Sequence, residues 1–207
     1  MGYTGWSRET AAMIGLNGGA VDIDILPLSI GRAAVAYCPT STSDGGDALI
    51  GLGWQEPEDQ RGKAVASFLK GKKVLGLEKS VSQYVFDRAL EEHGLNPDDF
   101  TFSNMDPAQA ALGMQQGQFD AIMVWNPFVR QSLKVFNAQK PKPGVVLDSH
   151  DIPGEVIDMF VAGADVYQTP EGKAFCAATV DAYYMVCRLL DDPKVRDRTL
   201  VDLGRNF

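Results

Sequence analysis

The stretch FDAIMVWNPFVR, residues 119–130, decides how this chain is interpreted. Its first half, Phe119 to Val124, is a continuous apolar run of the kind that forms a buried strand. The run then passes into Trp125, Asn126 and Pro127, which are an amphipathic ring, an amide and a residue that stops strands. A buried strand that ends on such groups predicts a surface at which something binds.

Other apolar runs are spaced along the chain at intervals that leave room for helices. We read them as strands at residues 21–26, 33–38, 73–77, 100–104 and 156–162. Capping residues mark the helices between them. Ser80 or Ser82 opens a helix that ends at Gly94, Asp106 opens a second, and Thr169 opens a long third. Strands alternating with helices predict an α/β fold.

Two segments of the sequence share the same order of predicted elements. Residues 11–27, AAMIGLNGGAVDIDILP, and residues 110–127, AALGMQQGQFDAIMVWNP, both read as helix, glycine, strand and proline, with Asp22 and Asp120 at the same step. The match could arise by chance, since helix–Gly–strand joints are common. The alternative is two similar lobes that present the carboxyl ends of their strands to a shared crevice, where open α/β sheets place ligands.

Composition excludes several classes of function. The chain has 207 residues, enough for one large domain or two small lobes. Its net charge of -8 argues against binding nucleic acid, which needs clustered cations. No apolar run is long enough to insert directly into a membrane, and the first residues lack the pattern of a secretory signal. Cys176 and Cys187 are eleven residues apart on one expected helix, about 16 Å, too far for a disulfide.

Four segments carry a family resemblance: TSTSDGGDALIG (40–51), LKGKKVLGLEKSVSQYVFDRALEEHGL (69–95), DAIMVWNPFV (120–129) and DSHDIPGEVIDMFV (148–161). By their order and spacing, the chain over residues 10–192 resembles the type II periplasmic solute-binding proteins of the nitrate, sulfonate, taurine and pyrimidine-precursor branch. Within it, the chain looks most like the binding proteins of ABC transporters associated with urea carboxylase.

The resemblance implies an α/β, two-lobed type II periplasmic-binding-protein-like fold with a reduced first lobe. That lobe would comprise residues 1–42 and 155–207 and be incomplete at its N-terminus, because the family's first strand, first helix and second strand have no counterpart. The second lobe would comprise residues 43–154. A homodimer, or the segment Met1–Trp6, would then cover the unfilled sheet edge.

The implied function is solute binding for an ABC importer. A small nitrogenous solute, urea-, amide- or guanidine-like, would be captured between the lobes and passed to an ABC transporter permease, with no covalent chemistry, cofactor or metal. The resemblance implies a periplasmic location, and a chain complete as given would be cytoplasmic. Two alternatives stay open: an enzyme like the pyrimidine-precursor synthase of thiamine biosynthesis, and a truncated interaction module.

Candidate ligand-binding residues come from strand ends and crossings. Trp125 would supply an apolar or cation–π wall and Asn126 a hydrogen-bonding amide. A helix N-terminus after a strand would suit an anionic or carbonyl oxygen. The remaining candidates lie at the presumed lobe crossings and opposite Trp125 in the repeat. The set besides Trp125 and Asn126 is Ser80, Ser82, Gln83, Ser43, Asp44, Asp47, Ser29, Gly154 and Glu155.

Each candidate also has a structural explanation. Ser80 and Ser82 would cap a helix with or without a ligand, Trp125 could pack on the hinge, and Gly-rich acidic turns are usually just solvated. The acidic candidates, together with Asp158, favour a planar nitrogenous solute over an anion, for which Lys79 is the lone nearby cation. Catalytic motifs are missing from the sequence. Of the two histidines, His93 suits the last turn of a helix and His150 a loop without diagnostic metal-ligand spacing.

Overall fold

The computed structural model describes residues 26–27, 33–134 and 141–204. They form two compact units that are treated separately. Of the described residues, unit 1 contains those from Thr40 to Asp158, and unit 2 contains those before Thr40 and those after Asp158. The unit boundaries lie within the strands that run between the units. They fall at 39/40 and 158/159.

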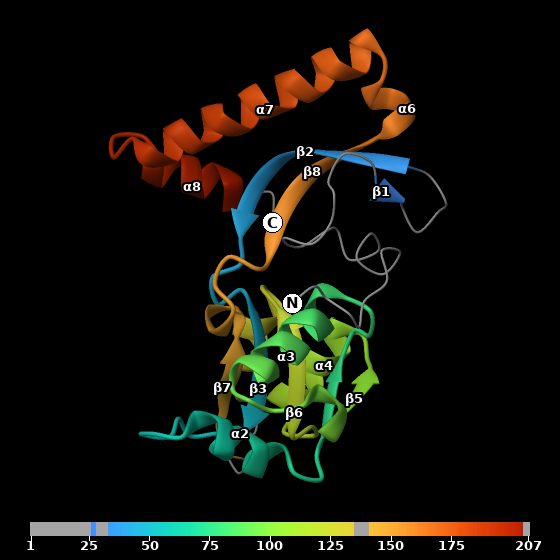
Figure 1. Cartoon of the computed structure of the whole chain (residues 1–207). Helices are drawn as coiled ribbons and strands as arrows, with labels where there is room; N and C mark the ends of the chain where they lie inside the picture. The colour runs from blue at the N-terminus through green and yellow to red at the C-terminus, as the bar shows by residue number, and fades with distance from the viewer. Residues whose placement is uncertain (1–25, 28–32, 135–140, 205–207) are drawn as a thin grey trace. The chain divides into compact units, whose positions relative to one another are not determined.

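Unit 1 is built on a five-stranded sheet with the order β5-β4-β6-β3-β7 (Figure 1). The strand β4 is parallel to β5 and β6, whereas β3 is antiparallel to β6 and β7. The strands are β3 Asp47–Leu52, β4 Lys73–Gly76, β5 Thr101–Asn104, β6 Ala121–Trp125 and β7 Pro143–Asp148.

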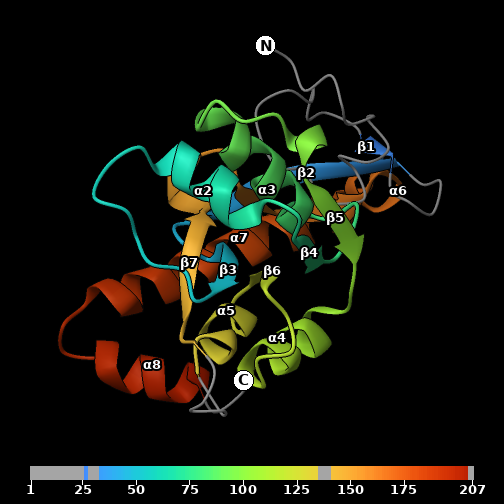
Figure 2. The ribbon, with the colours of Figure 1, turned by 90° about the horizontal axis from the view of Figure 1, so that it is seen from below.

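Helices cover both faces of this sheet, as Figure 2 shows. One face carries α2, Arg61–Leu69, and α3, Val81–Glu92; the other carries α4, Pro107–Gln115, and α5, Phe128–Ser132. Two short 3₁₀ helices complete the unit, η1 at Pro97–Asp99 and η2 at Ser149–Asp151. The unit therefore has three layers, with a buried sheet in the middle.

Alternation along the strands separates two hydrophobic cores. In β6, Ala121 and Met123 join the core beneath α2 and α3, while Ile122 and Val124 join the core beneath α4 and α5. Successive side chains of a strand point to opposite faces, so a strand buried on both sides must be apolar throughout. The run AIMVW meets this requirement, which is why the opening stretch forms the central strand.

Local signals set the helix ends in unit 1. The Asp106 side chain accepts hydrogen bonds from the N–H groups of Ala108 and Gln109, with Pro107 at the first helical position of α4. Gly94 follows α3 with a φ of 73°, the left-handed conformation that glycine adopts without strain. These caps agree with the sequence prediction.

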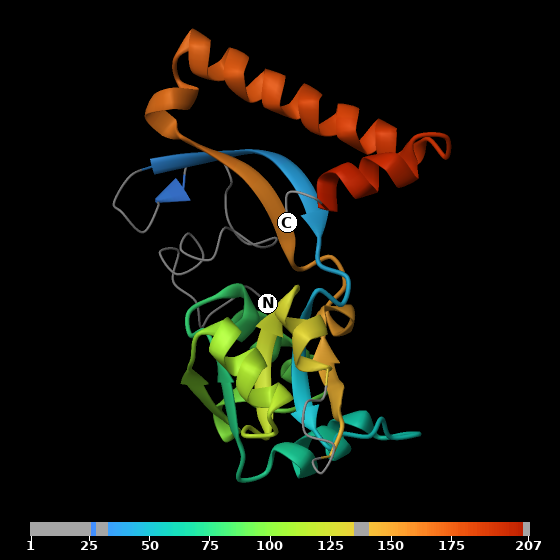
Figure 3. The same ribbon diagram turned by 180° about the vertical axis from the view of Figure 1, so that it is seen from behind.

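Unit 2 is a three-stranded sheet, ordered β1-β2-β8, with helices (Figure 3). Leu26 and Pro27 pair antiparallel with Ala34 and Ala33. Both β2 and β8 continue across the unit boundary. The elements are β1 Leu26–Pro27, β2 Ala33–Thr42, β8 Ile157–Gly163, α6 Ala164–Tyr167, α7 Pro170–Asp191 and α8 Arg196–Gly204.

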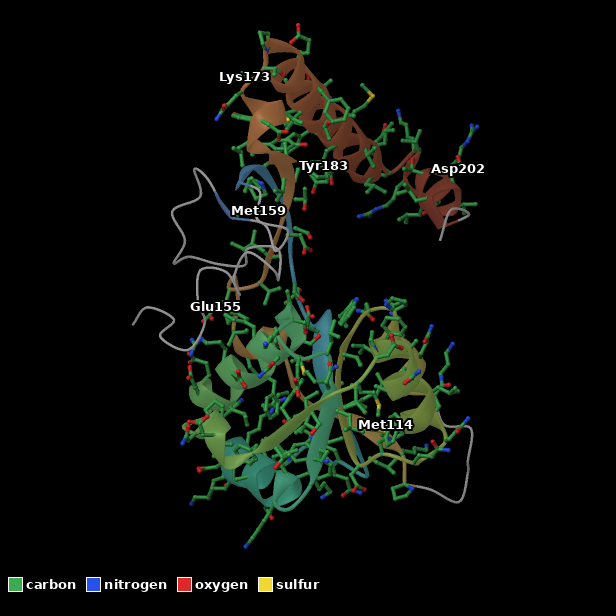
Figure 4. The ribbon with its side chains drawn as sticks, turned by 90° about the vertical axis from the view of Figure 1, so that its right-hand side faces the viewer. Met114, Glu155, Met159, Lys173, Tyr183 and Asp202 are labelled. Carbon is green, nitrogen blue, oxygen red and sulfur yellow. The ribbon has the colours of Figure 1, made fainter. Side chains whose placement is uncertain are left out.

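One side of α7 packs on the unit 2 sheet. The Tyr183 ring, labelled in Figure 4, meets the Phe160 ring of β8 edge-on at 5.6 Å, and Cys176 is buried. At the start of the helix, Gly172 lies against the carbonyl oxygen of Val166, where a Cβ would clash. Much of the remaining surface of α7 is exposed, Phe175 most of all among its large apolar residues.

The α/β prediction is confirmed. The strands expected at 33–38, 73–77, 100–104 and 156–162 are present with end shifts of a few residues, and so are the helices opened near Ser80, Asp106 and Thr169. The helices α2, α5, α6 and α8 and the strand β7 were not predicted. Cys176 and Cys187 form no disulfide, as their spacing predicted, and Cys38 is also free. The strand at 21–25 and the helix near 7–17 lie outside the described residues.

Candidate functional site

All five strands of unit 1 bring polar residues to a single edge of the sheet. The parallel strands β4, β5 and β6 end there, and so does β7. The antiparallel strand β3 starts at the same edge, because Asp47 pairs with Trp125 and Ala48 with Asp148. We call this the carboxyl edge, comprising residues 43–47, 77–83, 104, 125–127 and 148–151.

Trp125 and Asn126 stand at the centre of the carboxyl edge. Trp125 is partly buried and its ring meets that of Phe128 edge-on at 5.9 Å. Asn126 is exposed, and its backbone N–H donates to the carbonyl oxygen of Gly46 at 2.8 Å. Its side-chain amide forms no hydrogen bond with any described residue, so the amide is available to a ligand. The Asn126–Pro127 peptide bond is cis.

The loop of Ser43, Asp44 and Asp47 lies beside Asn126, as the Gly46 hydrogen bond requires. The Ser43 hydroxyl donates to Asp47 Oδ2 at 2.7 Å and lies 2.9 Å from the Ser149 hydroxyl, which in turn accepts from the Gly45 N–H. Burial raises the pKa of Asp47, and the Ser43 hydrogen bond opposes that rise. Asp47 is therefore a buried, internally bonded group of the loop.

His150 holds the exposed end of the same loop. Its Nε2 lies 3.0 Å from Asp44 Oδ1 and its Nδ1 lies 2.8 Å from Asp148 Oδ1. Gly45 has a φ of 71°, and a Cβ there would strike the His150 ring. The hydrogen bond to Asp148 raises the pKa of His150, and the charges of Asp148 and Asp44 add to the rise. The sequence had marked His150 as an ordinary loop residue and missed this contact.

Ser80, Ser82 and Gln83 form the start of α3, directly after β4. Ser80 occupies the N-cap position, but its hydroxyl donates to the carbonyl oxygen of Leu77, so no side chain caps the helix. Ser82 is fully buried and its hydroxyl has no hydrogen-bond partner among the described residues. Gln83 Oε1 accepts from the Lys79 N–H at 2.7 Å. The first turn of α3 thus retains hydrogen-bonding capacity that nothing described in the structure uses.

Lys79 has a positive φ of 56°, which is uncommon outside glycine. The preceding residue explains how the turn is held: the Glu78 N–H donates to Asn104 Oδ1 at 3.1 Å, and the Asn104 N–H donates to Glu78 Oε1 at 3.0 Å. This reciprocal pair joins the end of β5 to the turn after β4. Sequence reasoning missed it, because the two residues are 26 positions apart.

Glu155 belongs to a separate network. One of its oxygens accepts from Tyr84 and from Arg88 Nε at 2.9 Å, and the other accepts from Arg88 at 2.8 Å. Hydrogen bonds from the Arg88 guanidinium therefore lower the pKa of Glu155, and partial burial opposes that shift. Gly154 precedes it with a φ of 78°. Asp158 accepts from the Ser41 hydroxyl. Ser29 lies outside the described residues.

The carboxyl edge brings aromatic, amide and hydroxyl groups together beside carboxylates that already have partners. Among the described residues, no group of three or more His, Cys, Asp or Glu side chains could hold a metal ion. In the second histidine, His93, Nε2 lies 3.0 Å from Asp151 Oδ1. The same Asp151 oxygen lies 3.5 Å from a guanidinium nitrogen of Arg61. What the edge offers is an aromatic wall at Trp125, an unengaged amide at Asn126 and unused donors at the start of α3.

The NMT1-like family matches residues 36–199 of the chain. No curated protein is significantly similar to it. Within the described residues, no helix has both the length and the apolar character needed to cross a membrane.

The fold is that of solved periplasmic binding proteins. The aliphatic sulphonate binding protein SsuA of Escherichia coli is similar over 86% of this chain, at 20% identity and a TM-score of 0.63. The alkanesulfonate-binding protein SsuA of Xanthomonas axonopodis pv. citri, bound to MOPS, is similar over 82% of this chain, at 17% identity and a TM-score of 0.57. The sulfonate-binding protein SsuA of Methylobacillus flagellatus KT is similar over 80% of this chain, at 18% identity and a TM-score of 0.56. The type II periplasmic-binding-protein-like fold is thereby confirmed.

This chain spans only part of those relatives, covering 55%, 54% and 46% of the three chains. Identities at this level establish the fold and leave the ligand open.

Proposed function

We propose a function from a plain premise: this chain belongs to the NMT1-like family. In our proposal it is a solute-binding protein that captures a small solute and delivers it to an ABC permease in the periplasm. One lobe would be residues 43–154 and the other would be the flanking segments. The carboxyl edge would be the part of the ligand site that the lobe of residues 43–154 supplies. One observation carries the proposal: the exposed Asn126 amide and the first turn of α3, which no side chain caps, lie at the same end of the sheet.

The solute we propose is a neutral planar nitrogenous compound, a urea or an amide. Its carbonyl oxygen would accept from the N–H groups at the start of α3, where the helix dipole also favours negative charge. Its N–H groups would donate to Asn126 Oδ1, and its plane would lie against the Trp125 ring. The resemblance to urea-carboxylase-associated binding proteins supports the same choice.

Guanidinium and amine solutes fit less well than the sequence alone indicated. The four acidic residues that favoured them have partners within unit 1: Asp44 with His150, Asp47 with Ser43, Glu155 with Arg88 and Asp158 with Ser41. A cation would have to displace these partners, whereas a neutral amide need not.

A second candidate is an anionic oxygen ligand such as a sulfonate. The uncapped start of α3 and the exposed Lys79 beside it favour this class. The enzyme and interaction-module alternatives gain no specific support from the described residues. The homodimer expected from sequence is also a proposal, and the α7 helix bears on it below.

Isothermal titration calorimetry tests the proposal with urea, acetamide, guanidine and methanesulfonate as titrants. We expect micromolar binding of a urea or amide compound, about -8 kcal/mol. Trp125→Ala should weaken it at least tenfold, because the ring is exposed enough to contact the solute and forms the wall of the proposed site. Trp54→Ala is the matched control: Trp54 follows the opposite end of β3 and packs on Phe68 at 5.3 Å, so the affinity should change less than twofold.

The outcomes separate the two parts of the proposal. Binding of methanesulfonate without heat from urea or acetamide means that solute binding stands and the proposed ligand class is wrong. No heat from any of these, or from a wider set of amides and sulfonates, contradicts the solute-binding function and favours the interaction module. If Trp125→Ala and Trp54→Ala lose equal affinity for the solute, then the solute does not bind at the carboxyl edge.

A further inference from the structure

The long helix α7 carries an apolar stripe that no described residue covers. Phe175, Ala178, Ala182, Met185 and Leu189 recur at spacings of three, four, three and four. All five are exposed, Phe175 by 68%, Met185 by 57% and Leu189 by 42%. This is the a/d spacing of a heptad repeat, in which each apolar residue packs into a facing helix. We call these five residues the α7 seam.

The seam is distinct from the side of α7 that packs on its own sheet. That inner side includes the buried Cys176 and the partly buried Tyr183, whose ring contacts Phe160 of β8. Figures 1 and 4 show α7 lying along the β2–β8 ribbon with side chains projecting around the helix. Packing within unit 2 therefore explains one apolar side of α7 and leaves the seam unexplained.

We propose that the α7 seam binds the α7 seam of a second copy of this chain, with the two helices antiparallel. The inference goes beyond solute binding and does not depend on it, because every group assigned to the solute site belongs to unit 1.

The sizes of the seam residues select the pairing. In an antiparallel coiled coil an a residue faces a d residue of the other helix. With Ala182 opposite Met185 of the second copy, Leu189 lies opposite Ala178, so Met185 and Leu189 each meet a methyl group, while Phe175 lies at the end of the pairing opposite Asp192. Such alternation of large and small residues fills the space between helices without cavities or overpacking.

The charges beside the seam select the same pairing. Asp181 and Arg188 occupy the g positions, and neither has an ion-pair partner among the described residues. In the pairing set by size, Asp181 lies beside Arg188 of the second copy, and two-fold symmetry repeats the contact. The helix thus carries, on one side, the two charges that its own antiparallel copy would neutralise.

Other arrangements lose these matches. A parallel pair would place Ala178 and Ala182 opposite themselves and leave a gap. An antiparallel pair shifted by one heptad would place Asp181 beside Asp181, a like-charge contact that is unfavourable. The seam is also short: Phe175 to Leu189 spans about 21 Å at 1.5 Å per residue. We therefore expect a weak dimer in the micromolar range, typical of small interfaces.

Sedimentation equilibrium of the full chain, from low to high micromolar concentration, tests the proposal. We expect a monomer–dimer equilibrium. Asp181→Arg should weaken the dimer at least tenfold, because it places two arginines beside each other in both contacts. Arg188→Asp should do the same. The double variant Asp181→Arg/Arg188→Asp should restore association, since the charges are merely exchanged.

Asp191→Arg is the matched control. Asp191 is exposed on the same helix but lies off the seam, so its charge reversal should leave the dimer unchanged. Circular dichroism of every variant confirms that α7 stays folded. A chain that is monomeric at all concentrations overturns the proposal, and so does a dimer that ignores Asp181→Arg or is not rescued by the exchange. Calorimetry on the same variants keeps the tests apart: solute affinity should not change when the dimer is lost.

Discussion

The helices α3 and α7 show how differently the two units are stabilised. In α3, six of twelve residues are buried, and five of them belong to the larger core of unit 1. In α7, two of twenty-two residues are buried, and large apolar side chains such as Phe175 and Met185 face outward. The two hydrophobic core clusters formed by described residues belong wholly to unit 1. An amphipathic pattern in the sequence therefore predicts a helix but not how much of that helix its own unit buries.

The comparison has an energetic meaning. Each fully buried apolar side chain contributes about 1.5–3 kcal/mol relative to an exposed one. The stability of unit 1 should therefore respond strongly to single substitutions in α3, while the matching substitutions in unit 2 should do little. Three pairs of variants probe this contrast.

The largest contrast is expected between two phenylalanines. Phe86 of α3 is 1% exposed, and Phe175 of α7 is 68% exposed. Phe86→Ala should destabilise the protein by about 3–4 kcal/mol, because it leaves a cavity against Phe102 at the sheet. Phe175→Ala should change the free energy of unfolding by less than about 0.5 kcal/mol. Urea denaturation of both variants measures the difference. At concentrations low enough for the chain to be monomeric, similar losses in the two would mean that other parts of the same chain cover Phe175.

A smaller contrast is expected between two arginines. Arg88 binds Glu155 through two hydrogen bonds, with side-chain exposures of 20% and 33%. Arg198 lies 3.8 Å from Asp202 on the surface of α8. Arg88→Met should cost about 2 kcal/mol, because Glu155 loses its charged partner, whereas Arg198→Met should cost about 0.5 kcal/mol or less.

The pH dependence sharpens that prediction. Arg88 lowers the pKa of Glu155, so this contribution is present above the unfolded pKa near 4.5 and is lost as the pH falls through the lower folded value. Denaturation curves at pH 7 and pH 3 should therefore differ less in Arg88→Met than in the unmodified chain. An equal pH effect in both would show that the pair does not stabilise unit 1.

The smallest contrast is expected between two aspartates, and here the substitution in α3 should stabilise the protein instead of destabilising it. Burial raises the pKa of Asp87 in α3 to about 7, and the charges of Glu91 and Asp98 add to the rise. A raised folded pKa means that this group's stabilisation is complete below its unfolded pKa near 3.8 and is lost as the pH rises toward 7. Asp87→Asn removes the buried charge and should stabilise the protein by about 1–2 kcal/mol at pH 8 after allowance for solvent screening.

At pH 4 the stabilising effect of Asp87→Asn should shrink toward zero. Asp191→Asn on exposed α7 provides the comparison and should be neutral at both pH values. Thermal unfolding at pH 4 and pH 8 measures both variants. If Asp87→Asn is neutral or destabilising at pH 8, then Asp87 has a partner in solution that lowers its pKa.

Elements with local signals were predictable from sequence, and the others were not. Asp106 and Thr169 each accept hydrogen bonds at a helix start, and both helices were predicted. The helix α2 was missed because its N-cap residue, Gln60, makes no capping bond and adopts a left-handed conformation. The strand β7 was missed because six residues after a proline-rich run carry too little periodicity to identify a strand that pairs only at the sheet edge.

The candidate site divides in the same way. Trp125 and Asn126 were predicted, because an apolar strand ending on an aromatic ring and an amide is a local pattern, and their contact with a solute remains a prediction. The engagement of Glu155 by Arg88 could not be predicted, because 67 residues separate them. For the same reason, the contact of His150 with Asp44 and the pairing of Glu78 with Asn104 emerged only from the folded chain.

By itself, the sequence determined the α/β class, the caps that start α4 and α7, and the buried central strand that ends at Trp125. Each of these depends on neighbours within a few positions, through hydrogen bonds to the nearest backbone groups and the alternation of side chains. The tertiary structure alone decided which strands share an edge, which carboxylates are already paired and which side of α7 stays exposed. Those outcomes depend on contacts between distant residues, which the pairing of strands and the packing of helices bring together only after folding.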